Sequence, residues 1–331
     1  MQTRPLGRTG LTVTPLGLGL AALGRPGYIN LGHAGDLNHH YGVEEMQARA
    51  CSVLEAAWNA GIRYVDAARS YGRAEEFLGN WLTQHAFAAG AITVGSKWGY
   101  TYTADWQVEA DKHEVKDHSL PVLRRQIQES RALLGPHLCL YQIHSATLES
   151  GVLQNDAVLD ELARLRHEGL TIGLTLSGPK QAETLRKALE VRRDGILLFG
   201  VVEATWNLLE RSAAAALQEA HDAGLGVLVK EALANGRLTS RNDEPSFSAQ
   251  RQALERAAGE QHVTMDALAL AAALAEPWAD VVLSGAVSIA QLHANLAALD
   301  CRWTPDLAAR FASLVEEPGE YWAKRGLLAW N

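Results

Sequence analysis

The chain has 331 residues, 47% of them hydrophobic and 21% charged, which is the composition of an ordinary globular protein with a large core. Its formal net charge of -8 argues against a nucleic-acid or anionic-membrane partner, because phosphate groups are bound by clustered Lys and Arg. Three widely spaced cysteines, no apolar signal core and no apolar run of about 18 residues predict a cytoplasmic protein without a disulfide framework or membrane span.

The N-terminal segment predicts a small hairpin and then a long loop. Residues 4–19 are typical of two short strands around a turn, with a further strand near 16–19. Gly17-Leu18-Gly19 resembles a relaxed dinucleotide-binding fingerprint, which needs a helix that starts directly on the glycines. Residues 24–41 are typical of a loop instead, so we reject a Rossmann site here.

From residue 43 onward, amphipathic helices alternate with short apolar strands. The predicted helices cover 43–60, 74–85, 119–134, 156–168, 179–191 and 212–223, with two more segments within 248–275 and another at 289–299. The predicted strands cover 16–19, 64–66, 92–97, 138–144, 171–177, 197–203, 226–230 and 281–284. Such strands need a parallel sheet covered by helices, and eight units in roughly 300 residues fit a closed (β/α)8 TIM barrel. An open doubly wound sheet is the alternative.

Polar residues at the ends of these strands favour the barrel. They are Asp66, Lys97, His144, Ser177, Glu203, Lys230 and Ser284. In a barrel the C-terminal ends of the strands meet at one mouth, where active sites lie. The loop 98–118 and the segment 231–260 are longer than the other connections, so we expect both to hang over that mouth.

Four residues at this mouth have the chemistry of an acid/base site. An ammonium at Lys97 would lower the pKa of the Tyr71 phenol, and a carboxylate at Asp66 would keep that ammonium charged. Such a tyrosine can protonate a carbonyl oxygen, and a neutral His144 would orient the carbonyl. The set holds no covalent nucleophile, so a nicotinamide hydride is the expected electron source. Singly, Asp66 could be a helix cap and His144 an ordinary buried histidine.

The motifs that carry these residues resemble those of the aldo-keto reductases. They are Tyr64 to Gly72, Ser96-Lys97-Trp98-Gly99 and Tyr141-Gln142-Ile143-His144, within a resemblance that runs from Leu6 to about Leu299. The resemblance implies one TIM-barrel domain over residues 1–331, with an N-terminal β-hairpin cap and a C-terminal helical tail. It also implies reversible NAD(P)H-dependent reduction of an aldehyde or ketone, with Tyr71 as general acid/base.

The resemblance further implies a cofactor site. Its residues would be Gly19, Ser177, Gly178, Glu203, Lys230, Glu231, Leu233, Ser284, Gly285, Ala286, Val287, Ser288, Gln291 and Asn295. Gly285, Val287 and Gln291 stand where NADPH-selective members usually carry Lys or Arg for the 2′-phosphate. The Ser288 hydroxyl and the amides of helix 289–299 could hold a phosphate instead. We therefore expect NADP(H) on family grounds, with weak selectivity and NAD(H) as a second candidate.

The nicotinamide end departs further from the family pattern. Glu203 replaces a Gln, and Lys230-Glu231-Ala232 replace a stacking aromatic followed by Ser-Pro. We predict an ion pair between Glu203 and Lys230 beneath the nicotinamide. These changes keep open a second function, a cofactor-binding regulatory protein with little turnover.

The substrate end has no motif of its own. Ala21, Trp98 and Trp206 are candidate substrate contacts, with core packing as the alternative role of both tryptophans. The tail 316–331 carries Tyr321, Trp322 and Trp330, and the resemblance implies that it folds over the mouth. Plain packing or a subunit contact is the alternative for the tail, since Trp and Tyr are common in both settings.

Overall fold

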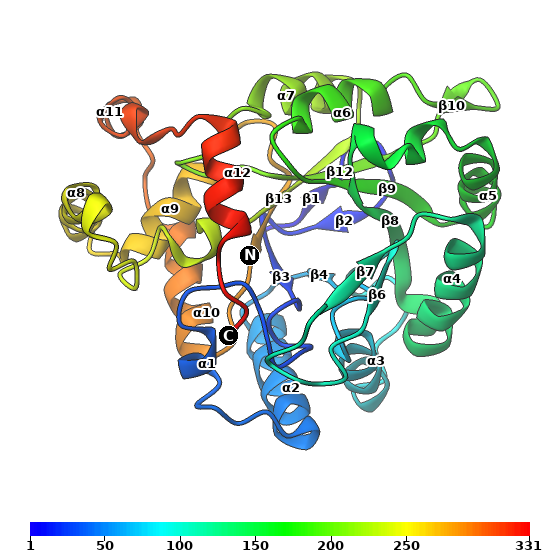
Figure 1. Ribbon diagram of the computed structural model, residues 1–331, viewed down its shortest axis with the longest axis horizontal. Helices are drawn as coiled ribbons and strands as arrows, with labels where there is room; N and C mark the ends of the chain where they lie inside the picture. The colour runs from blue at the N-terminus through cyan, green and yellow to red at the C-terminus, as the bar shows by residue number, and fades with distance from the viewer.

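The computed structural model describes residues 1–331, and its centre is a closed barrel of parallel strands (Figure 1). In barrel order these are β3 (Leu16–Gly19), β4 (Tyr64–Asp66), β5 (Thr93–Trp98), β8 (Leu138–Ala146), β9 (Thr171–Leu176), β12 (Val201–Thr205), β13 (Gly226–Lys230) and β14 (Val281–Ser284). Strand β14 pairs with β3 and closes the ring. The predicted TIM barrel is confirmed, and the open sheet is excluded.

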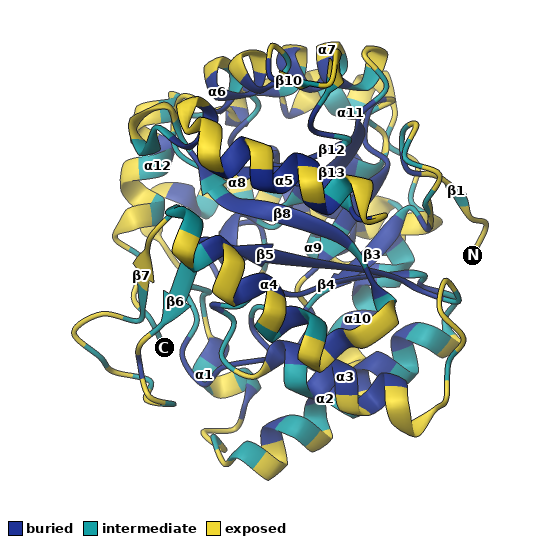
Figure 2. Cartoon of the chain, turned by 90° about the vertical axis from the view of Figure 1, so that its right-hand side faces the viewer, coloured by how far each residue is buried: buried dark blue, intermediate teal, exposed yellow.

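Helices surround the barrel and cover its outer face. They are α2 (Val43–Asn59), α3 (Ala74–Gln84), α4 (Leu120–Leu134), α5 (Asp156–His167), α6 (Gln181–Ala188), α7 (Ala214–Asp222), α8 (Ser248–Glu260), α9 (Met265–Leu274) and α10 (Ile289–Leu296). Figure 2 shows α4 and α5 with buried and exposed residues alternating along the helix, as amphipathic helices packed on a sheet require. None of the helices is both long and apolar enough to cross a bilayer.

The N-terminal hairpin closes one end of the barrel. Strands β1 (Arg4–Pro5) and β2 (Thr12–Val13) pair antiparallel, as predicted. Leu6, between the two strands, and Val13, on β2, are fully buried and pack with inward-facing strand residues such as Tyr64 and Leu228. Figure 2 shows the N-terminus and the C-terminus on opposite sides of the molecule. The hairpin therefore leaves the other end of the barrel open for a site.

Three predicted connections contain structure that the sequence patterns did not reveal. The predicted strand 197–203 is present but displaced, because the barrel strand β12 begins only at Val201 and ends at Thr205. Residues before it form a separate hairpin of β10 (Arg192–Arg193) and β11 (Ile196–Leu197), turned by Asp194 and Gly195 at positive φ. The loop 98–118 contains the hairpin β6 (Tyr100–Tyr102) and β7 (Glu114–Lys116), and the loop 24–41 contains the short helix α1 (His33–Asp36).

The C-terminal tail crosses the open end of the barrel. After α11 (Pro305–Arg310) comes α12 (Pro318–Gly326), which lies in front of the barrel in Figure 1, and the chain ends beside α1. The last residue is held by backbone hydrogen bonds, since the Asn331 and Tyr28 N–H groups each donate to the other's carbonyl oxygen, at 3.2 and 3.1 Å. The loop 24–41 and the tail therefore form one layer over the mouth.

Candidate active site

A cavity of about 580 Å³ opens at the C-terminal ends of the strands. Six of the seven polar residues predicted to end strands line it: Asp66, His144, Ser177, Glu203, Lys230 and Ser284. The seventh, Lys97, is fully buried beneath them. The loops predicted to cover this mouth do so, because Tyr100 and Glu114 of the β6–β7 hairpin also line the cavity, as does Asn235.

The four acid/base candidates meet on one side of this cavity. Strands β4 and β5 are neighbours, so their ends place Asp66 and Lys97 together, and the Lys97 ammonium donates to the Asp66 carboxylate. The ammonium also lies 5.2 Å from the centre of the Tyr71 ring. The Tyr71 and His144 rings meet edge to face with centroids 5.5 Å apart. The fold thus assembles a carboxylate, an ammonium, a phenol and an imidazole from separate segments.

His144 is held as a neutral imidazole. Burial lowers its pKa well below the usual value, and the charge of Lys97 lowers it further. Its Nδ1 lies 3.4 Å from the Ser70 hydroxyl, which is the only side-chain hydrogen-bond partner of the ring. A neutral ring with one nitrogen bound by a hydroxyl can present the other nitrogen as a donor.

The phenol of Tyr71 differs from the expectation of a lowered pKa. Burial raises its pKa, and the opposing effect of Lys97 does not overcome it. The carboxylates of Asp66 and Glu203 add to the upward shift. Tyr71 is therefore held in its protonated form, which suits a proton donor.

The predicted ion pair between Glu203 and Lys230 is wrong. Glu203 lies 3.3 Å from the Lys97 ammonium, whereas Lys230 donates to Thr205 at 3.1 Å and lies 3.8 Å from Glu231. The register of β12 and β13 explains this, because Lys230 pairs with Thr205, two residues beyond Glu203 along the strand. The two charges therefore occupy different layers of the barrel.

Comparison with known proteins settles the family. Residues 15–316 match the model of the Aldo/keto reductase family. The chain belongs to this family. It is 27% identical to pyridoxal 4-dehydrogenase of Microbacterium luteolum, over 89% of this chain and 92% of that protein. It is 26% identical to the aldo-keto reductase str7 of Strobilurus tenacellus, over 99% of this chain and 97% of that protein.

A solved structure supports the same fold. The holo form of an aldo-keto reductase from Bacillus halodurans superposes with a TM-score of 0.73, covering 96% of this chain and 97% of that one at 19% sequence identity. At this identity the likeness shows the shared barrel alone. The chain is thus an oxidoreductase by family, and aldo-keto reductases in general use NAD(P)H.

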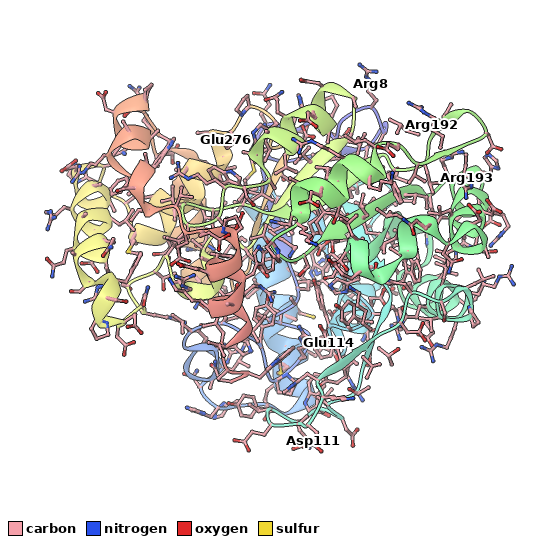
Figure 3. All side chains as sticks on the ribbon, turned by 45° about the horizontal axis from the view of Figure 1, so that its top comes forward. Arg8, Asp111, Glu114, Arg192, Arg193 and Glu276 are labelled. Carbon is pink, nitrogen blue, oxygen red and sulfur yellow. The ribbon has the colours of Figure 1, made fainter.

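In this aldo-keto reductase the part of the cavity next to Tyr71 is built around Arg25. Its side chain is 3% exposed, and Nη1 donates to the Ser70 carbonyl at 3.0 Å and to the Glu114 carboxylate at 2.9 Å. The guanidinium lies 5.3 Å from the ring centre of Tyr71 and 4.7 Å from that of Trp330. Figure 3 shows Glu114 far from Arg8, which belongs to the hairpin at the closed end.

Sequence reasoning missed Arg25, Tyr28, Tyr100 and Glu114 as cavity residues. All four lie in long connections between barrel elements, where no periodic pattern or motif marks a side chain. The tail folds over the mouth as the resemblance implied, since Leu328 and Trp330 both line the cavity.

The tail also reaches the cavity through an ion pair that no sequence pattern indicates. Arg325 donates from Nε to both oxygens of Glu231 at 3.0 Å. Burial works to raise the pKa of Glu231, but Arg325 and Lys230 outweigh it and hold that pKa at about 2. Helix α12 is therefore fixed to the end of β13 by a charged pair.

Two of the three predicted substrate contacts lie in the core, which is the alternative role of both tryptophans. Trp98 is fully buried and packs its ring 5.6 Å from that of His118, and Trp206 is 2% exposed and packs 5.9 Å from Trp278. Neither lines the cavity, whereas Ala21 does. Trp98 follows Lys97 in β5, and alternation along a strand sends the two side chains to opposite faces.

Most residues assigned to the cofactor line the cavity: Gly19, Ser177, Glu203, Lys230, Glu231, Leu233, Ser284, Gly285, Ala286, Gln291 and Asn295. Gly178, Val287 and Ser288 do not. The Ser288 hydroxyl caps α10 by accepting from Gln291 N–H at 3.2 Å, and Val287 is buried. The cavity therefore runs from Tyr71 to the start of α10, and its volume is within the usual range for cofactor sites.

Proposed function

We propose that this aldo-keto reductase reversibly reduces an aldehyde or ketone to an alcohol with NAD(P)H, and that Tyr71 is the general acid. The observation that carries the proposal is the meeting of Tyr71, His144 and Asp66 at the wall of one cavity, with the Lys97 ammonium buried beneath them. Each residue alone has an ordinary structural role, but the four together have no structural requirement to converge on open space.

The chemistry follows from the protonation states. A carbonyl oxygen between Tyr71 and His144 would accept a hydrogen bond from each, which draws electron density from the carbonyl carbon. NAD(P)H supplies the hydride when it is bound. The phenol proton of Tyr71 moves to the oxygen as the alcohol forms, and Lys97, held by Asp66, stabilises the phenolate that remains. In the reverse direction the phenolate takes the proton from the alcohol.

The cofactor end supports weak discrimination between NADPH and NADH. Gly285, Gln291 and Asn295 line this end and carry no charge. Arg241 also lines the cavity, but it is ion-paired with Asp36. A 2′-phosphate would gain few charge-assisted hydrogen bonds from these residues, so we propose that both cofactors bind.

Replacement of Tyr71 tests the mechanism. We expect Tyr71→Phe to reduce turnover by about 10²-fold or more while the cofactor dissociation constant, followed by tryptophan fluorescence, stays unchanged. Tyr100→Phe is a matched control, because Tyr100 also lines the cavity but lies outside the Lys97 cluster. Full activity in Tyr71→Phe would remove Tyr71 from this role. Aromatic aldehydes head the substrate panel, since Tyr28, Tyr100 and Trp330 line the cavity and one relative is named for pyridoxal.

A second candidate function is cofactor binding with little turnover. It is favoured by the nicotinamide end, where Glu203 is occupied by Lys97 and Gln142 at 3.3 Å each and the half-buried Lys230 adds an amine whose pKa is lowered by burial. The two functions are separated by titrating NADPH and NADH and then adding a broad panel of aldehydes and ketones. Tight cofactor binding without turnover on the whole panel would favour the regulatory function.

A further inference from the structure

The buried ammonium of Lys97 has two carboxylate partners. It donates to Asp66 and lies 3.3 Å from Glu203 Oε2. The side chain of Lys97 is 0% exposed and those of both acids are 2% exposed, so the three charges are shielded from water. Where both acids are ionised, one positive charge faces two negative charges beneath Tyr71.

Neighbouring groups fix Glu203 in this place. Gln142 on β8 donates its amide N–H to the same oxygen, Glu203 Oε2, at 3.3 Å. Tyr64 on β4 donates to the other acid, Asp66, at 3.3 Å. Each carboxylate therefore has one neutral donor in addition to the shared Lys97 ammonium.

The other titratable groups around Tyr71 and Lys97 come from four segments. They are Arg25 and Tyr28 in the loop after β3, Tyr64 on β4, His144 on β8 and Lys230 at the end of β13. Arg25 is neutralised by Glu114, Lys230 lies beside Glu231, and His144 is neutral. Only Asp66 and Glu203 lie within ion-pair distance of the Lys97 ammonium.

We infer that Glu203 is a positioning residue, a second counter-ion that offsets the field of Lys97 at Tyr71 and keeps Tyr71 in its proton-donating form. The inference rests on the proposed function and adds that Glu203 sets the pH range over which the enzyme reduces carbonyl compounds. A neutral Gln, which the family usually carries here, would leave Lys97 with one counter-ion. With Glu203 present, the equilibrium of the reaction is unchanged, but Tyr71 stays protonated to a higher pH. Carbonyl reduction therefore continues at a pH where it would otherwise fail.

The pKa of Asp66 agrees with this arrangement. Burial raises it, Lys97 opposes the rise and Glu203 adds to it, so that the pKa of Asp66 reaches about 7. A second carboxylate beside the same lysine hinders the ionisation of Asp66, as a like charge in a shared site does. The same negative charge raises the pKa of Tyr71.

The test is Glu203→Gln, which has nearly the same shape and restores the usual family residue. The kcat/KM for carbonyl reduction should begin to fall at a pH about 1 to 2 units lower than in the wild type, because a negative charge near the phenol is gone. Alcohol oxidation should become measurable at correspondingly lower pH. Unchanged pH limits in both directions would overturn the inference.

Three further variants make the test specific. Glu203→Asp keeps the charge, so its pH limit should stay close to that of the wild type. Glu203→Met removes the charge without adding an amide, so its pH limit should shift in the same direction as that of Glu203→Gln. Glu210→Gln replaces another fully buried Glu, one that binds Ser212, and should leave the limit in place. A shift in Glu210→Gln equal to that in Glu203→Gln would count against the inference.

A titration without turnover separates this inference from the proposed function. The absorbance of ionising tyrosine, with the signal of the matching Tyr71→Phe protein subtracted, reports the phenol of Tyr71 directly. An earlier rise in Glu203→Gln than in the wild type would support the inference even if no carbonyl substrate were turned over. Coincident curves would overturn it even if the enzyme were fully active.

Discussion

The indole ring of Trp330 lies flat against the imidazole of His113, with centroids 4.0 Å apart and planes inclined by 4°. This contact joins the next-to-last residue of the chain to the β6–β7 insertion. The guanidinium of Arg25 lies 4.7 Å from the same indole ring. Three connections that are distant in sequence thus meet at one aromatic side chain above the substrate end of the cavity.

Removal of this side chain should weaken substrate binding. We expect Trp330→Ala to raise KM for a carbonyl substrate about tenfold or more. The cavity loses an aromatic wall, and water then fills the space that the indole ring occupied. The cofactor dissociation constant should change little, since most residues assigned to the cofactor lie between β12 and α10. Trp330→Phe keeps a ring and should retain most of the affinity. Steady-state kinetics and a fluorescence titration of each variant check this, and an unchanged KM in Trp330→Ala would contradict it.

The pair of Arg325 and Glu231 should stabilise the fold. Glu231 is 8% exposed as a side chain, so Arg325→Met would leave a buried carboxylate without its main partner. We expect a loss of about 2–4 kcal/mol in the free energy of unfolding, measured by urea denaturation. Arg186→Met is the control, because its pair with Glu219 is exposed at the surface and contributes little. Equal losses in the two variants would rule out a special contribution from the Glu231 pair.

A cation placed at Gly285 should create selectivity for NADPH. No atom lies within 4 Å of a side chain built at Gly285, so Gly285→Lys fits without displacing its neighbours. We expect binding of NADPH to strengthen about tenfold relative to NADH, the size of a charge-assisted hydrogen bond. Gly259→Lys adds the same charge at an equally open position outside the cavity and should leave the ratio unchanged. Titration of both cofactors against both variants tests this prediction. An unchanged ratio of the NADPH and NADH dissociation constants in Gly285→Lys would place the 2′-phosphate elsewhere.

Acid should destabilise the protein partly through His33. This side chain is fully buried, and burial lowers its pKa to about 4. The unfolded chain binds a proton near pH 6.5 while the folded chain does not, so stability is lost as the pH falls from about 6.5 to 4. The loss from this one group should approach about 3 kcal/mol. His33→Gln should lose less stability over the same interval in urea unfolding at a series of pH values; an equal loss would assign the effect to other groups.

The sequence by itself determined the barrel and the acid/base residues. Apolar strands alternate with amphipathic helices, and that local pattern has few three-dimensional solutions. Asp66, Lys97 and His144 each end a predicted strand, and strand ends of a parallel barrel must meet at one mouth. The tail over the mouth came from resemblance to a family and not from local physics.

Tertiary structure alone decided which charges pair. Glu203 and Lys230 both end predicted strands, but register places Glu203 deeper, against Lys97. Arg25 and Arg325 lie in a loop and a tail, and their partners Glu114 and Glu231 are far away in the chain. Periodicity reports which face of an element is buried; it does not report the register between strands or the path of a loop. Those depend on packing of the whole chain, and in this protein they set the electrostatics around Tyr71.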